Sequence, residues 1–99
     1  MKLAIHFRKR GHKFGAVTEA DYEQMAETFI FGPMDSDTHD CIRSGGQDRL
    51  RFKHSNFYLG IEIIALRCVR TFFPVEPQVV ARWGGAVKYQ DRQCKRRFS

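Results

Sequence analysis

The spacing of apolar residues changes from a helical to an extended period partway along the chain, and this change limits the possible folds most. Over residues 22–30, apolar residues recur at positions i, i+3, i+4, i+7 and i+8, which is typical of an amphipathic helix. Thr18 has the residue type of an N-cap, and Gly32 with the following proline ends the pattern. Over residues 49–53, apolar and cationic residues alternate, as in a strand with one buried face. We therefore predict an α+β domain.

Short strands surround the alternating segment. Residues 41–43 are predicted to form the preceding strand, connected to it by the glycine-containing turn 44–48. Two further strands are predicted over 57–65 and 66–73, although no Gly, Asn or Asp marks a turn between them. The sequence thus predicts an antiparallel meander.

Helical segments are predicted before and after the sheet along the chain. Residues 6–15 wind into a helix with an apolar stripe and a flank of His6, Lys9, Arg10 and Lys13. Residues 77–83 and 88–97 are short helical candidates separated by two glycines. The whole chain, 1–99, is predicted to form one domain. Its parts are a helical part at 1–31, an antiparallel sheet at 39–77 and a basic C-terminal extension at 78–99.

The charges are unevenly distributed along the chain. The formal net charge is +6, residues 18–40 carry seven acids and no Lys or Arg, and the remaining residues are strongly cationic. Aromatic residues are interleaved with the cations, which favours nucleic acid as the partner over other anions. No apolar run is long enough for a membrane helix, so no membrane association is expected.

Three cysteines, Cys41, Cys68 and Cys94, are spaced without a C-x-x-C pair. An odd number of cysteines at such spacing is typical of reduced thiols in the cytoplasm. The apolar stretch after Met1 is too short for a signal peptide. The spacing also argues against a zinc site. We expect a cytoplasmic protein with no metal and no cofactor.

Four motifs occur in order along about three quarters of the chain. They are His-Phe-x-x-x-Gly-x-x-Phe-Gly at 6–15, Thr-x-x-x-Tyr-x-x-Met-Ala-x-x-Phe-x-x-Gly-Pro at 18–33, Cys-x-Arg with Asp-Arg-x-Arg-Phe within 41–52, and Arg-Thr-Phe-Phe-x-x-x-Pro at 70–77. Together they resemble toxin-like ribonuclease domains of the barnase, EndoU, colicin D and RelE group, and colicin D-like and contact-dependent inhibition tRNases in particular.

The resemblance implies two N-terminal helices packed on a four- to five-stranded antiparallel sheet. It also implies metal-independent cleavage of RNA, often tRNA, by 2′-hydroxyl attack that leaves a 2′,3′-cyclic phosphate. A histidine of the first helix would transfer protons, while Arg and Thr side chains of the sheet would hold the phosphate. This chain departs from colicin D-like members at Arg10, where they carry histidine, and at residues 62–66, where they have a glycine-containing turn.

These arguments give one set of candidate site residues. The predicted catalytic residues are His6, Arg51 and Thr71, and the predicted RNA- or phosphate-binding residues are Lys9, Arg10, Arg43, Arg49, Arg70 and Phe73. Imidazole titrates near neutral pH, which makes His6 a candidate acid or base. Each residue also has a structural alternative: the cations can be solvated charges, Thr71 an ordinary strand residue and Phe73 part of the core.

We therefore expect an endoribonuclease of the toxin type, acting on tRNA or other structured RNA and neutralised by an acidic immunity or antitoxin protein. The first alternative is a non-catalytic nucleic-acid-binding module on the same scaffold. The second is an interaction protein that docks a partner through the acidic helix at 18–31.

Overall fold

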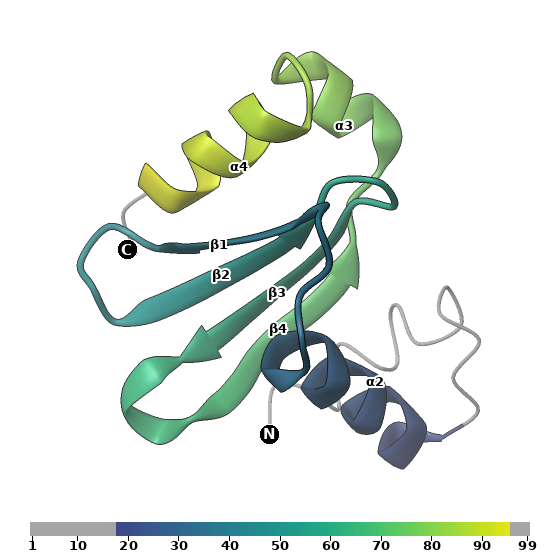
Figure 1. The fold of residues 1–99 in the computed structure, drawn as a ribbon, viewed down its shortest axis with the longest axis vertical. Helices are drawn as coiled ribbons and strands as arrows, with labels where there is room; N and C mark the ends of the chain where they lie inside the picture. The colour runs from purple at the N-terminus through teal and green to yellow at the C-terminus, as the bar shows by residue number, and fades with distance from the viewer. Residues whose placement is uncertain (1–17, 96–99) are drawn as a thin grey trace.

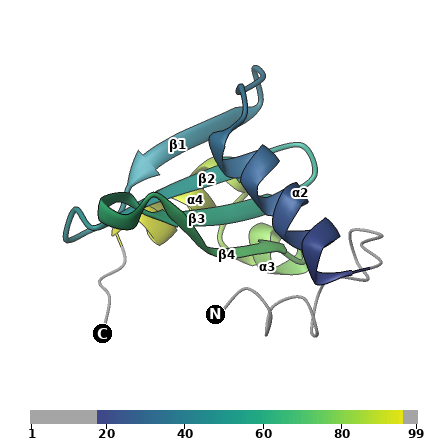
Figure 2. The ribbon, with the colours of Figure 1, turned by 90° about the horizontal axis from the view of Figure 1, so that it is seen from below.

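A four-stranded antiparallel sheet separates two helical layers (Figure 1). The structure is a computed structural model and describes residues 18–95. In chain order the elements are α2 (Glu19–Phe31), β1 (Thr38–Ile42), β2 (Asp48–Lys53), β3 (Tyr58–Ile63), the 3-10 turn η2 (Ile64–Leu66), β4 (Cys68–Pro74), α3 (Pro77–Arg82) and α4 (Ala86–Lys95). The strands lie in the sheet in chain order, and Figure 2 shows α2 on one face with α3 and α4 on the other.

The predicted helix after Thr18 is confirmed as α2. The Thr18 hydroxyl accepts a hydrogen bond from the Asp21 amide, and the Asp21 carboxylate accepts one from the Thr18 amide, at 3.1 and 3.2 Å. This reciprocal cap satisfies two amides that have no partner within the helix. The apolar stripe is buried against the sheet, where the Tyr22 hydroxyl donates to the carbonyl oxygen of Phe72.

The alternation in β2 is also confirmed, because its two faces meet different layers. Leu50 and Phe52 are fully buried in a core that α3 and α4 complete with Val80 and Tyr89. A second core lies between α2 and β4 on the other face. There Ile30 lies very close to Gly60 of β3. A Cβ atom at Gly60 would lie only 2.4 Å from Cδ1 of Ile30. Gly60 thus allows the close contact between α2 and the sheet.

The prediction of two N-terminal helices packed on the sheet is wrong in its placement of the helices. Within residues 18–95, one helix precedes the sheet and two follow it, as α3 and α4. The helix predicted at 6–15 lies outside the described residues. α3 and α4 have positions close to the predicted segments 77–83 and 88–97, and they contribute Val80 and Tyr89 to one core. The C-terminal extension is therefore part of the fold up to Lys95.

The connection between β3 and β4 is longer than predicted. β3 ends at Ile63, and η2 separates it from β4. Arg67 then adopts a left-handed conformation, with φ of 49°, which glycine usually supplies at such a position. A non-glycine residue carries no sequence signal for this conformation, so the pattern predicted two adjoining strands.

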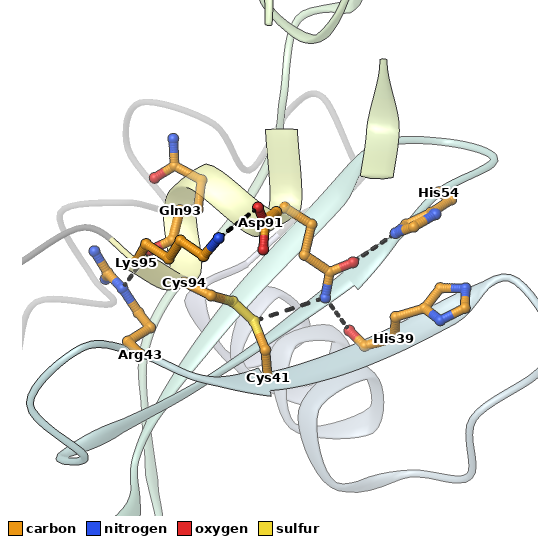
Figure 3. Close-up of a disulfide and its surroundings, with 9 residues drawn as sticks. His39, Cys41, Arg43, His54, Asp91, Gln93, Cys94 and Lys95 are labelled. Carbon is orange, nitrogen blue, oxygen red and sulfur yellow. Dashed lines mark hydrogen bonds and ion pairs between the residues drawn. A yellow bond between two sulfur atoms is a disulfide. The ribbon is translucent and has the colours of Figure 1, made fainter. Parts of the chain in front are cut away.

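Cys41 of β1 and Cys94 of α4 form a disulfide (Figure 3). Their Cα atoms lie 6.2 Å apart, and the Ser44 amide donates to the carbonyl oxygen of Cys94 at 2.7 Å. The prediction of reduced thiols is therefore wrong for this pair, while Cys68 is free. The cysteines consequently give no support to a cytoplasmic location, which stays a prediction. Separately, none of the helices within 18–95 is long and apolar enough to cross a membrane.

Candidate functional site

Arg51, a predicted catalytic residue, lies on the α2 face of the sheet and is held by protein acceptors. Its guanidinium donates to both carboxylate oxygens of Asp40, at 2.7 and 3.0 Å. It also donates to the carbonyl oxygens of Phe29 and Gly32 at the end of α2, each at 2.8 Å. Arg51 is only 6% exposed. Arginine commonly binds the last carbonyls of a helix, so this side chain fixes α2 to the sheet.

Arg49 has a similar position two residues earlier. It contacts Asp40 at 2.8 Å, Glu62 at 2.7 Å and the carbonyl oxygen of Ile30 at 2.8 Å. Because the Arg49 guanidinium already donates to acceptors within the protein, an RNA phosphate would have to displace these acceptors to bind it. We therefore leave Arg49 and Arg51 out of the RNA site proposed below.

The arginines keep the shared carboxylate ionised. Burial alone would raise the pKa of Asp40, but hydrogen bonds and positive charge from Arg51 and Arg49 outweigh it and lower this pKa. Burial alone would lower the pKa of Arg49, but its hydrogen bonds to Glu62 and Asp40, together with their negative charge, outweigh burial and raise this pKa. The cluster is thus an ionised structural network between α2, β1 and β2.

Three other predicted residues lie on the opposite face of the sheet or at the bulge beside it. Thr71 pairs in register with Ile61, and Phe73 packs against the α3–α4 core. The register shifts between Ile61 and Glu62, which leaves Arg70 as the extra residue of a β-bulge. Phe73 is half-buried, which supports the core alternative over a base-stacking role.

Arg70 and Arg43 meet at Asp48, which is only 2% exposed. Arg70 forms an ion pair with the Asp48 carboxylate at 3.0 Å, and the Arg43 amide donates to the Asp48 carbonyl oxygen at 2.9 Å. The Arg43 guanidinium donates to the carbonyl oxygen of Gln93 in α4. The Arg70 side chain retains 33% exposure, whereas Arg43 is buried. The structure thus brings Arg43 and Arg70 to the same residue, Asp48, and places Thr71 on the sheet face opposite to Arg49 and Arg51.

The accessible positive charge lies elsewhere. Within residues 18–95, five Lys or Arg residues are exposed, and four of them lie on α3 or α4. These four, Arg82, Lys88, Arg92 and Lys95, form what we call the α3–α4 cationic surface. Lys88, Arg92 and Lys95 are spaced at i, i+4 and i+7, so they share one side of α4. From the sequence, this region was predicted to hold two short helices in a basic extension, and none of these four residues was selected for the site.

Trp83 lies at the C-terminal end of α3 among these cations and is 40% exposed. The Arg92 Cζ atom lies 4.8 Å from the centroid of its ring, a cation–π contact. Trp83 was not among the site residues predicted from the sequence. The available signal was a single tryptophan between an arginine and two glycines, in a basic segment.

His39 and His54 form a second group that the sequence analysis did not select. Their ring centroids lie 4.2 Å apart, and the antiparallel pairing of β1 with β2 brings them together. Gln90 of α4 contacts His54 Nε2 through its side-chain oxygen and donates to the His39 carbonyl oxygen at 2.8 Å (Figure 3). A cavity of about 380 Å³ lies here, bordered also by the disulfide. Two imidazoles thus line this cavity.

The predicted residues His6, Lys9 and Arg10 lie outside the described residues. Within 18–95, no three His, Cys, Asp or Glu side chains are placed to hold a metal ion. In comparisons with known proteins, no protein family, curated protein or solved structure matches the chain. The resemblance to toxin-like ribonucleases therefore rests on the four quoted motifs alone.

Proposed function

We propose that this protein binds RNA and cleaves it without a metal ion, in the manner of the toxin-like ribonucleases whose motifs it resembles. The observation that carries the proposal is the α3–α4 cationic surface with Trp83 exposed among its charges. Cationic side chains neutralise phosphates, and aromatic rings stack bases. Polyanions without bases would use only the first property, so the combination favours nucleic acid, and the resemblance to ribonucleases favours RNA.

Cleavage by the 2′-hydroxyl needs a base for that hydroxyl, an acid for the leaving 5′-oxygen and a fixed cation at the phosphate. We assign proton transfer to His6 on the basis of the motif at 6–15. Arg70 is the most exposed of the predicted sheet arginines, at 33% for its side chain, and we assign it to the phosphate. Thr71 follows it and supplies a hydroxyl on the sheet face where α3 and α4 pack.

The second candidate function is RNA binding without cleavage. Two observations favour it: Arg49 and Arg51 are occupied within the fold, and Arg10 stands where colicin D-like members have histidine. Arginine stays protonated at any usable pH and cannot act as a base. The two candidates share the same RNA-binding surface and differ only in chemistry.

RNA incubated with the purified protein in EDTA separates the two candidates. We expect cleavage of an unmodified strand with 2′,3′-cyclic phosphate ends, and no cleavage of the same strand with 2′-O-methyl groups, because methylation removes the attacking hydroxyl. Binding of both strands without cleavage of either would leave the non-catalytic module. Equal cleavage of both would contradict attack by the 2′-hydroxyl.

We also propose an acidic immunity or antitoxin protein as the partner, since an acidic surface complements the α3–α4 cationic surface. We place the activity in the cytoplasm, where the RNA is. Disulfides are rare in that compartment, so the bond between Cys41 and Cys94 would there be exposed to reduction. Co-purification of the protein with a co-expressed acidic partner, lost at high salt, would support this pairing.

A further inference from the structure

The most accessible aromatic ring in the cationic region is Trp83. It has 40% of its surface exposed, although its residue type is usually well buried. Two hollows of about 320 and 470 Å³ adjoin it, and Trp83 and Arg92 line both of them. Among the described residues, the others that line the hollows are polar: Gln93 and Lys95 in one, and Arg82, Lys88 and Asp91 in the other. The ring is therefore bordered by charged groups in a concave setting.

The turn between α3 and α4 positions one of these charges. Gly84 has φ of +93°, and a Cβ built on it would lie 2.8 Å from Cδ of Lys88 and 3.7 Å from its Nζ atom. Only glycine accommodates both this backbone conformation and the close passage of the lysine side chain. The Lys88 side chain thus passes close to the turn that follows Trp83. Arg92 approaches the ring itself.

We propose that Trp83 is the stacking site for one unpaired base, and that the preferred ligand of this surface is single-stranded RNA. This inference rests on the proposed RNA binding and adds the class of RNA to it. The base enters a hollow and stacks against the Trp83 and Arg92 pair, while Lys88 and Arg82 contact the flanking phosphates. In a duplex the bases are already stacked and paired, so they cannot reach the ring.

The test compares three proteins on two ligands. Native protein, Trp83→Ala and Trp83→Phe are titrated with a 2′-O-methyl single strand and with the matching 2′-O-methyl duplex, neither of which is cleaved. Stacking on an aromatic residue contributes strongly to affinity, so Trp83→Ala should bind the single strand about ten-fold more weakly or worse. Trp83→Phe should retain most of the affinity, and the duplex should bind all three proteins alike.

Fluorescence gives an independent readout in the native protein, because Trp83 is the only tryptophan in the chain. The single strand should quench its emission, and heparin, a polyanion without bases, should quench it much less. Arg67→Asn serves as the control for loss of one exposed charge, since asparagine tolerates the left-handed conformation at that position. Arg67→Asn should leave both the quenching and the preference for single strands unchanged.

Several outcomes would overturn the inference. One is equal loss of single-strand and duplex affinity in Trp83→Ala. Another is unchanged binding in that variant, and a third is equal quenching by heparin and RNA. Failure of the inference is distinguishable from failure of the proposed function. Cleavage with an unchanged KM in Trp83→Ala refutes only the stacking site, whereas single-strand quenching without cleavage refutes only the ribonuclease.

Discussion

Arg51 and Asp40 lie directly opposite each other on β2 and β1 and form an ion pair at two points, Nε to Oδ1 at 2.7 Å and Nη2 to Oδ2 at 3.0 Å. The same guanidinium reaches the last carbonyl groups of α2. One side chain therefore connects two strands and a helix. The acidic stretch at 18–40 and the cations of β2 are partners within the protein, which the sequence analysis treated as separate features.

Removal of Arg51 should destabilise the fold. Arg51→Ala leaves the carbonyl oxygens of Phe29 and Gly32 without this donor and leaves Asp40 with Arg49 alone. Leaving partly buried acceptors unpaired costs about 1–3 kcal/mol. Urea unfolding of Arg51→Ala and of Arg67→Asn provides the comparison, with a change within about 0.5 kcal/mol expected for the exposed control. If Arg51→Ala were as stable as native protein but no longer bound RNA, the structural role would be contradicted. The prediction that Arg51 contacts the RNA phosphate would then be favoured.

The same network predicts the response to acid. The pKa of Asp40 is lowered from 3.8 in the folded protein, so its contribution to stability is complete above the unfolded pKa. The contribution is lost as the pH falls through the folded pKa. Asp40→Asn should therefore be less stable at neutral pH and should lose less stability between about pH 5 and about pH 2. Parallel stability curves for the two proteins, measured by urea unfolding, would exclude Asp40 as a source of acid sensitivity.

Reduction of the disulfide should lower the melting temperature. The bond joins residues 53 positions apart, and closing a loop of that length stabilises a fold by about 4 kcal/mol in the chain-entropy account. The melting temperature of native protein should be lower with reductant than without it, and the same should hold for Cys68→Ser. The double variant Cys41→Ala, Cys94→Ala should melt low under both conditions. A native protein that is insensitive to reductant would show that the bond is absent.

Much of the fold could be predicted from the sequence, because local patterns determine it. The apolar stripe and the Thr18 cap predict α2, and the alternation at 49–53 predicts β2. Contacts between distant residues could not be predicted in this way. The proximity of Gly60 to Ile30 and the pairing of Cys41 with Cys94 depend on how the layers pack, and no spacing along the chain encodes them.

The kinds of residue at the site could be predicted from the sequence, but their positions and exposure in the fold could not. The sequence indicated a surplus of cations, but alternation alone cannot tell a solvent-facing arginine from one that meets a carboxylate nine or eleven residues earlier, as Arg49 and Arg51 do. Exposure is a property of the finished fold. In the fold, the exposed cations lie on α3 and α4, which the sequence predicted as short helices without a site role.

His6 provides the direct test of the proposed chemistry. His6→Ala should lower RNA cleavage by about 10² to 10⁴ while leaving binding of 2′-O-methyl RNA intact. Arg10→His should raise the rate, because a second titrating group can share the two proton transfers. If His6→Ala cleaves as fast as native protein, His6 has no part in the reaction. The pair His39 and His54 would then be the next group to substitute.

Both candidate functions require RNA to bind at the α3–α4 cationic surface, and the salt dependence of affinity measures this most directly. For single strands, the slope of log K against log salt changes by about 0.7 for each phosphate contact. The triple variant Arg82→Gln, Lys88→Gln, Arg92→Gln should therefore bind a 2′-O-methyl single strand with a slope smaller by about 2, while Arg67→Asn keeps the native slope. A triple variant with the native slope and affinity would contradict RNA binding at this surface.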